Sequence, residues 1–271
     1  MKFTILGSNG FIGKNLLESL KKKEIETYCP DIRKDDVSGD NLGNIIFVIG
    51  VTDFLIRPFD AVDAHVCYLK KILTDSTFDS LLYCSGTRVY QNGTNTDEKT
   101  SLSVNPNNLD HLYNISKIMG ESLCFASKNP KIKIVRLSNV TGNNFNSNLF
   151  IPSIIRDAVK TKKIILKSTL NSTKDYIHVN DVTNILQKIC IDGKNQIYNV
   201  ASGQNISSQE IIEKINQVEP IDVEVLPNSP ENSFPPIDIK LLKNEFNFKP
   251  MNILDHIPDM VHEFKNFFKN N

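Results

Sequence analysis

Tyr113 and Lys117 are the residues of this sequence best suited to moving a proton. They stand four residues apart in the run YNISK, a spacing that places both side chains on one face of a helix. An ammonium group beside a phenol favours the phenolate, so we expect Lys117 to lower the pKa of Tyr113. Such a tyrosine can take a proton from a hydroxyl, or give one to a ketone, while a hydride leaves or joins the same carbon.

A glycine-rich segment near the start of the chain suits a dinucleotide phosphate. Residues 7–13 read GSNGFIG, after a β-rich run and at the start of a helical pattern. Gly7 permits a tight turn, Gly10 lets backbone N–H groups approach a pyrophosphate, and Gly13 lets the helix pack against the strand. The helix N-terminus adds partial positive charge. The context therefore predicts a nicotinamide dinucleotide site.

Asp31 indicates which dinucleotide binds. It ends the second expected strand, eighteen residues after Gly13. There a carboxylate can accept hydrogen bonds from both adenosine ribose hydroxyls and would repel a 2′-phosphate, which favours NAD over NADP. Arg33 and Lys34 stand close by and can serve a 2′-phosphate instead.

Alternating strands and helices must position these residues. Strands are expected at 2–6, 27–29, 44–50, 80–85, 132–137 and 197–201, and helices at 11–22, 58–73 and 110–127. This alternation predicts an α/β fold of the Rossmann type, a parallel sheet with helices on both faces. Further helices are expected at 151–161, from Ser207 or Ser208 to Val218, and at 253–268 with an interruption near Pro258; a strand is expected at 163–167, and 220–236 is expected to be irregular.

The chain resembles the extended short-chain dehydrogenase/reductases, the NAD-dependent epimerase/dehydratase family that modifies nucleotide-activated sugars. Six motifs carry the resemblance in order along the chain. They are GSNGFIG at 7–13, SGTRVY at 85–90, YNISKIMGE at 113–121, RLSNVTG at 136–142, KDYIHVNDV at 174–182 and YNVASG at 198–203. The resemblance implies an NAD-binding Rossmann domain at 1–140, rejoined by 176–202, and a small C-terminal substrate-binding subdomain from 141–175 and 203–271.

The family's residue roles carry over to matching positions. The resemblance implies that Tyr113 is the general acid or base and that Lys117 tunes it and holds the nicotinamide ribose. Residues expected to bind the sugar nucleotide are Thr87, Arg88, Asn139 and Lys174, the last in place of the family's arginine. Residues expected to contact the cofactor are Gly7, Asn9, Gly10, Phe11, Ile12, Gly13, Asp31, Ile32, Arg33, Ile49, Gly50, Val51, Cys84, Tyr113, Lys117 and Val140. No metal site is expected.

Three departures from the family pattern bear on the chemistry. Gly86 occupies the position of the active-site serine or threonine; the neighbouring Ser85 and Thr87 are the candidates to supply the missing hydroxyl, and we favour Ser85. His65 stands where asparagine is common, and a hydrogen-bonded interior histidine is the favoured interpretation over a proton relay. The segment between Asp31 and Ile45 is short, as though a helix and a strand were trimmed.

The choice of reaction follows from two positions. Sugar-nucleotide 4,6-dehydratases carry Asp-Glu where this chain has Thr87 and Arg88, which disfavours water elimination. The NAD preference inferred from Asp31 favours a nucleotide-sugar 4-epimerase working through a transient 4-keto intermediate. The alternative is an NAD(P)H-dependent reductase of a nucleotide 4-keto sugar. A more distant alternative, suggested by Gly86, is a non-catalytic dinucleotide-binding protein.

Composition limits the other partners. The formal net charge is zero, so no basic surplus indicates nucleic acid or an anionic membrane. No apolar run has the length of a membrane span, and the five cysteines lack metal-binding spacing; we expect a cytoplasmic protein with free thiols. Apolar residues on more than one face of the helices at 59–73 and 110–127 predict a homodimer.

Overall fold

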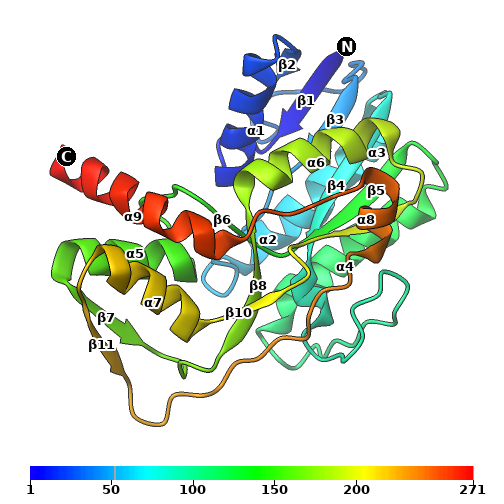
Figure 1. Ribbon diagram of the computed structural model, residues 1–271. Coiled ribbons are helices and arrows are strands. Elements are labelled where there is room, and N and C mark those ends of the chain that lie inside the picture. Colours follow the sequence, from blue (N-terminus) through cyan, green and yellow to red (C-terminus); the bar gives the residue numbers. More distant parts are fainter. Residues whose placement is uncertain (52, 271) are drawn as a thin grey trace. The chain divides into compact units, whose positions relative to one another are not determined.

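The apolar runs of the sequence form a parallel sheet with helices on both faces (Figure 1). The computed structural model describes residues 1–51 and 53–270, and among these residues six strands pair in the order β2-β1-β3-β4-β5-β9. They are β1 (Lys2–Leu6), β2 (Glu26–Tyr28), β3 (Asn44–Phe47), β4 (Ser80–Gly86), β5 (Ile132–Leu137) and β9 (Ile197–Val200). All of their pairings are parallel. The α/β fold expected from the sequence is confirmed.

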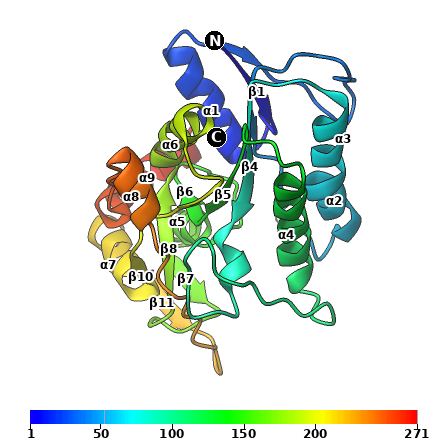
Figure 2. The same cartoon turned by 90° about the vertical axis from the view of Figure 1, so that its right-hand side faces the viewer.

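Each face of this sheet has its own pair of helices (Figure 2). On one face lie α1 (Phe11–Lys22) and α6 (Val179–Asp192), where Gln187 of α6 donates to the Ser19 hydroxyl of α1 at 3.1 Å. On the other lie α3 (Tyr68–Asp75) and α4 (His111–Ala126), packed on Leu81 and Tyr83 of β4. Strand β4 is buried at every position, as expected for a central strand covered on both faces.

The helix expected at 58–73 contains an irregular turn. It consists of α2 (Pro58–Val62), a π-helical turn η1 (Asp63–Cys67) and α3. A π turn holds one more residue than an α turn and often accompanies a functional site. Here it places the side chain of His65 in the interior, with none of its surface exposed.

The segment between β2 and β3 is short, as the sequence suggests. Among the described residues from 29 to 43 the chain forms turns and one isolated bridge, from Asn41 to Thr77, but no helix. It is nevertheless packed, because Val37 and Leu42 are fully buried. No further strand of the sheet therefore separates β2 from β3 along the chain.

A second compact unit is formed by 139–179, 201–237 and the residues from Lys249 onward. Its elements are β6 (Asn139–Thr141), α5 (Phe150–Thr161), β7 (Lys163–Leu166), β8 (Thr173–His178), β10 (Asn205–Ser207), α7 (Ser208–Val218), β11 (Asp222–Val225) and α9 (Ile253–Lys269). The first unit comprises 1–138, 180–200 and 238–248. It thus includes α8 (Lys240–Phe246), where Phe246 packs on Tyr198 of β9, although the sequence placed this segment in the smaller part.

Two local expectations for the second unit were wrong. Residues 220–236 are not wholly irregular, because β11 pairs in parallel with β7. The last helix continues through Pro258. Proline removes one backbone hydrogen bond, but Ile257, Val261 and Phe264 are buried in the core of this unit and hold the helix together. No helix within the described residues is long and apolar enough to cross a membrane.

Candidate active site

The glycine loop between β1 and α1 has a geometry that only glycine allows. Gly7 has a φ of +101°, and the Gly10 N–H donates to the Gly7 carbonyl at 3.0 Å. A Cβ on Gly13 would lie 2.2 Å from the Gly7 carbonyl oxygen. Helix α1 has neither a side-chain cap nor an acidic residue in its first turn. Its first N–H groups therefore remain available to an anion.

A cavity of about 380 Å³ opens over this loop. Of the residues predicted to contact a cofactor, it is lined by Gly7, Asn9, Gly10, Asp31, Ile32, Arg33, Ile49, Gly50 and Val51. Phe11, Ile12 and Gly13 lie in the first turn of α1, and Cys84, Tyr113 and Lys117 belong to β4 and α4; none of these six lines the cavity. Val140 belongs to the second unit.

Other residues of the cavity were not foreseen. They are Ser8, Pro30, Val48, Arg57, Asp60, Asp63, Ala64 and Tyr68. Four of them, at 57, 60, 63 and 64, recur at helical spacing on one side of α2 and η1. That spacing was the available signal, because residues three and four apart share a helix face.

Asp31 carries its negative charge beside a guanidinium. Arg33 donates to both of its carboxylate oxygens, from Nε at 2.8 Å and from Nη2 at 2.9 Å. This hydrogen bonding lowers the pKa of Asp31. The site thus offers a carboxylate for ribose hydroxyls and, on the exposed Arg33, a cation for a phosphate. The glycine loop, the uncapped helix and this carboxylate together fit an adenine dinucleotide.

Lys117 is tethered to the ends of two neighbouring strands. Its ammonium donates to the carbonyl of Cys84 at 2.8 Å and to that of Ile49 at 3.4 Å. It lies 6.0 Å from the centre of the Tyr113 ring. Burial lowers the pKa of Lys117 to about 8. The Lys117 ammonium is therefore held near the carboxyl ends of β3 and β4.

The pKa of Tyr113 is raised, which is the opposite direction from the one expected beside Lys117. Burial raises the pKa of Tyr113 to about 12, and the nearby charge of Arg88 offsets this only in part. Desolvation disfavours the phenolate, while the Lys117 ammonium is engaged by carbonyl groups. In the absence of bound molecules Tyr113 is a protonated phenol at neutral pH.

The phenol of Tyr113 faces the position of Gly86. A Cβ built on Gly86 would lie 3.3 Å from the Tyr113 hydroxyl. The hydroxyl of Ser85 is sealed from solvent and has no hydrogen-bond partner among the described residues. Thr87 begins the short 3-10 helix η2 (Thr87–Tyr90) and is buried. Whether Ser85 or Thr87 supplies the missing hydroxyl stays a prediction.

His65 contacts Tyr113 through its ring and through the Ser116 hydroxyl. Its Nδ1 lies 2.8 Å from the Ser116 hydroxyl, which donates to the Tyr113 carbonyl at 3.0 Å. Its Nε2 accepts from the Val51 N–H at 3.4 Å, and its ring packs edge-on against that of Tyr113. Burial lowers the pKa of His65 to about 2, so it is a neutral interior histidine.

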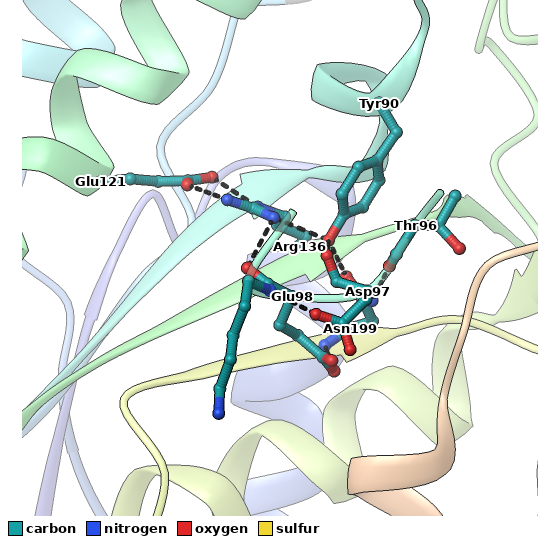
Figure 3. Close-up of polar contacts among 8 residues, drawn as sticks. Tyr90, Thr96, Asp97, Glu98, Glu121, Arg136 and Asn199 are labelled. Atoms are coloured by element: carbon teal, nitrogen blue, oxygen red, sulfur yellow. Dashed lines mark hydrogen bonds and ion pairs between the residues drawn. The ribbon is translucent and has the colours of Figure 1, made fainter. Parts of the chain in front are cut away.

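A buried polar network anchors α4 to the sheet (Figure 3). Arg136 of β5 forms two hydrogen bonds with the carboxylate of Glu121, at 3.1 and 2.7 Å, and donates to the Tyr90 hydroxyl at 2.7 Å. Tyr90 in turn donates to the side chain of Asn199 on β9 at 2.9 Å. Glu121 lies one helical turn beyond Lys117, so the network fixes the helix that carries Tyr113.

The remaining predicted substrate residues lie in different units. Asn139 and Lys174 belong to the second unit, where the Asn139 amide donates to the Asp175 carbonyl at 2.8 Å. Thr87 and Arg88 belong to the first unit, directly after Gly86.

Comparisons with known proteins show which family the chain is similar to. The family model described as NAD dependent epimerase/dehydratase family matches residues 64–201, half of the chain. The GDP-6-deoxy-D-talose 4-dehydrogenase of Aggregatibacter actinomycetemcomitans is 26% identical over 84% of this chain and 83% of that protein. The dTDP-4-dehydro-6-deoxyglucose reductase of Escherichia coli is 26% identical over 94% of this chain and 79% of that protein.

A solved structure shows the same fold. The UDP-glucuronic acid 4-epimerase of Bacillus cereus, determined with a fluorinated UDP-glucuronic acid and NAD, superposes with a TM-score of 0.80 at 16% identity, covering 98% of this chain and 100% of that chain. With the glycine loop, the Tyr113–Lys117 pair and the family match all in place, the chain belongs to the NAD-dependent epimerase/dehydratase family.

Proposed function

We propose that the protein transfers a hydride at C4 of the sugar of a nucleoside-diphosphate hexose, with NAD as its cofactor and Tyr113 as its acid or base. The observation that carries the proposal is the position of the Tyr113 phenol. It lies at the carboxyl end of β4, on the same helix as Lys117, and only β3 separates β4 from β1, the strand that leads into the glycine loop. Bound NAD(H) would accept or supply the hydride. Lys117 would hold the nicotinamide ribose, and Tyr113 would give a proton to the C4 oxygen, or take one from it, as the hydride is transferred.

Reduction of a 4-keto sugar is the direction that we favour. A phenol with a pKa raised to about 12 is protonated at neutral pH, and a protonated phenol can give its proton to the oxygen of a ketone as the hydride arrives. The relatives from Aggregatibacter and Escherichia are named as a 4-dehydrogenase and a reductase of a 4-dehydro sugar. Arg33 beside Asp31 would also tolerate a phosphorylated cofactor.

A nucleotide-sugar 4-epimerase is the second candidate, and Asp31 supports it. A carboxylate at this position favours NAD, the cofactor that an epimerase reduces and reoxidises within one catalytic cycle. In that reaction Tyr113 first takes the proton of the C4 hydroxyl and later returns it. The two candidates therefore use the same residues and differ in whether reduced cofactor is consumed.

A turnover assay tests the proposal. The purified protein is incubated with UDP-, GDP-, CDP- and dTDP-hexoses and with their 4-keto derivatives, with and without NADH or NADPH, and products are identified by NMR. We expect one reduced cofactor to be consumed for each 4-keto sugar that is reduced. Interconversion of C4 epimers without net cofactor consumption would establish the epimerase. Cofactor binding without turnover of any sugar would refute both and favour a non-catalytic dinucleotide-binding protein.

A further inference from the structure

Strand β4 offers no side chain at the position beside the Tyr113 oxygen. Position 86 points at the phenol, with a Cβ there 3.3 Å from the hydroxyl, yet the residue is glycine. Ser85 cannot be assigned the role from its contacts, because its hydroxyl is sealed from solvent. A phenol that gives up its proton here, or a substrate oxygen that shares it, needs another group to stabilise the negative charge.

Arg88 is the cation placed to do so. It lies two residues after Gly86, and the central carbon of its guanidinium lies 5.3 Å from the centre of the Phe54 ring. The same Phe54 ring packs against Tyr113, with ring centres 5.5 Å apart. Phe54 therefore has Arg88 and Tyr113 as direct neighbours. The Arg88 guanidinium is also fixed by Asp110, whose backbone carbonyl accepts a hydrogen bond from the Arg88 Nη2 at 3.4 Å.

One donor of Arg88 is left over. Its Nε is sealed from solvent and has no acceptor among the described residues. A buried N–H of a charged group without a partner is costly, and such a group is often completed by a ligand. The Asp110 carboxylate lies 3.8 Å from Nη2 and is exposed, so it neutralises Arg88 only weakly.

We propose that Arg88 stabilises negative charge on the Tyr113 oxygen and on the substrate oxygen that shares its proton, in place of the hydroxyl that Gly86 lacks. The part that concerns the substrate rests on the proposed function, whereas the part that concerns Tyr113 does not. The other titratable groups around Tyr113 are Lys117 on its own helix, Tyr83 and Cys84 on β4 and His65 on η1. The Lys117 ammonium donates to carbonyl groups and His65 is neutral, and the charge of Arg88 is a cause that lowers the pKa of Tyr113.

The first experiment measures the phenol without any substrate. Difluorotyrosine, whose phenol is more acidic, is incorporated at position 113 so that it titrates while the protein stays folded, and its pKa is read by fluorine NMR. In Arg88→Gln we expect the pKa to rise by about one unit, the low end of the effect of a nearby opposite charge, because Arg88 is partly exposed. Arg88→Lys keeps the charge and should shift the pKa less.

A matched control removes a charge elsewhere on the same unit. Lys99 is exposed, and Lys99→Gln should leave the pKa at position 113 unchanged. Thermal unfolding of each variant shows that the fold is kept. An unchanged pKa in folded Arg88→Gln would overturn the proposal, whether or not the protein turns over a sugar.

The second experiment measures turnover on the sugar found in the functional assay. Arg88→Gln should lower kcat about 100-fold, the usual loss for one donor to a developing oxyanion. Adding Gly86→Ser to Arg88→Gln should restore at least part of this loss, because a hydroxyl would then face the phenol. Full kcat in Arg88→Gln, combined with a loss in Ser85→Ala or Thr87→Val, would assign the role to a neighbouring hydroxyl instead. Absence of turnover in the parent protein would refute the proposed function and leave the fluorine titration to decide on Arg88.

Discussion

Replacing Arg136 with methionine removes one partner of an ion pair that water does not reach. The side chains of Arg136 and Glu121 are 5% and 4% exposed. Arg136 makes two hydrogen bonds to the Glu121 carboxylate and one to the Tyr90 hydroxyl, and Nη1 also donates to the Glu98 carbonyl at 3.3 Å. The substitution therefore leaves a carboxylate buried without its counter-charge.

The size of the effect follows from what each variant leaves unpaired. Removing one member of a buried ion pair costs about 3–5 kcal/mol. Replacing both members by methionine removes the orphaned charge, and the remaining cost is that of Tyr90 and Glu98 losing a donor, roughly 1 kcal/mol each. The double variant Glu121→Met/Arg136→Met should thus be more stable than Arg136→Met alone by about 1–3 kcal/mol.

The assay is thermal and urea unfolding of the parent, both single variants and the double variant. About 2–4 °C of melting temperature corresponds to 1 kcal/mol in a protein of this size, so Arg136→Met should melt roughly 10 °C lower. Lys131→Met, an exposed lysine just before β5, is the control and should change little. A loss below about 1 kcal/mol in Arg136→Met, or a double variant no more stable than it, would refute the argument that the pair is buried and mutually dependent.

Four further predictions concern the cofactor, the acid, pH and assembly. Asp31 should make NAD(H) bind at least about tenfold tighter than NADP(H), or about 1.4 kcal/mol, as measured by fluorescence titration; equal affinities would contradict this. Tyr113→Phe should keep cofactor binding and lose about 10²–10⁴-fold in turnover, and an active variant would exclude Tyr113 as the acid. Burial lowers the pKa of His65 from 6.5 to about 2, so below about pH 6.5 the unfolded chain binds a proton that the folded protein does not. As the pH falls below that value, this histidine should lower the free energy of unfolding by about 1.4 kcal/mol per pH unit. In His65→Gln the free energy of unfolding, measured by urea unfolding at several pH values, should depend less on pH. The exposed apolar side chains of Phe59 (82% exposed) and Phe125 (42%) support the predicted homodimer, which a monomer mass in light scattering at micromolar concentration would contradict.

Much of the fold could be predicted because its signals are local. The glycine loop, the apolar strands and the helical spacing each lie within a short stretch of sequence, and together they predict the parallel sheet. The helix of 179–192 was missed because its start, Val179, directly follows the last residue of β8, so that no turn residues separate the two. Strand β11 was missed because prolines nearby suggested irregular chain, whereas its partner β7 is more than fifty residues away.

Some features of the candidate site could likewise be predicted from local sequence, and others could not. Gly7, Asn9, Gly10 and Asp31 line the cavity because they lie in short segments that follow β1 and β2. The pKa of Tyr113 could not be predicted from its spacing to Lys117, because it depends on burial and on where the Lys117 ammonium finds acceptors. The neighbourhood of Arg88 depends on Phe54, which reaches it from a different part of the chain.

The π turn at Asp63–Cys67 sets the angular phase between two parts of one helix. Each residue advances an α-helix by about 100°, so the extra residue rotates everything on one side of the turn by that angle relative to the other. Arg57 and Asp60 precede the turn and Tyr68 follows it, yet all line the same cavity. Deleting a single residue such as Val66 would restore ideal α-geometry and turn one of these sets away. The shape of this cavity thus depends on the extra residue of the π turn, and a change in the length of the turn would alter the cavity more than most changes of side chain.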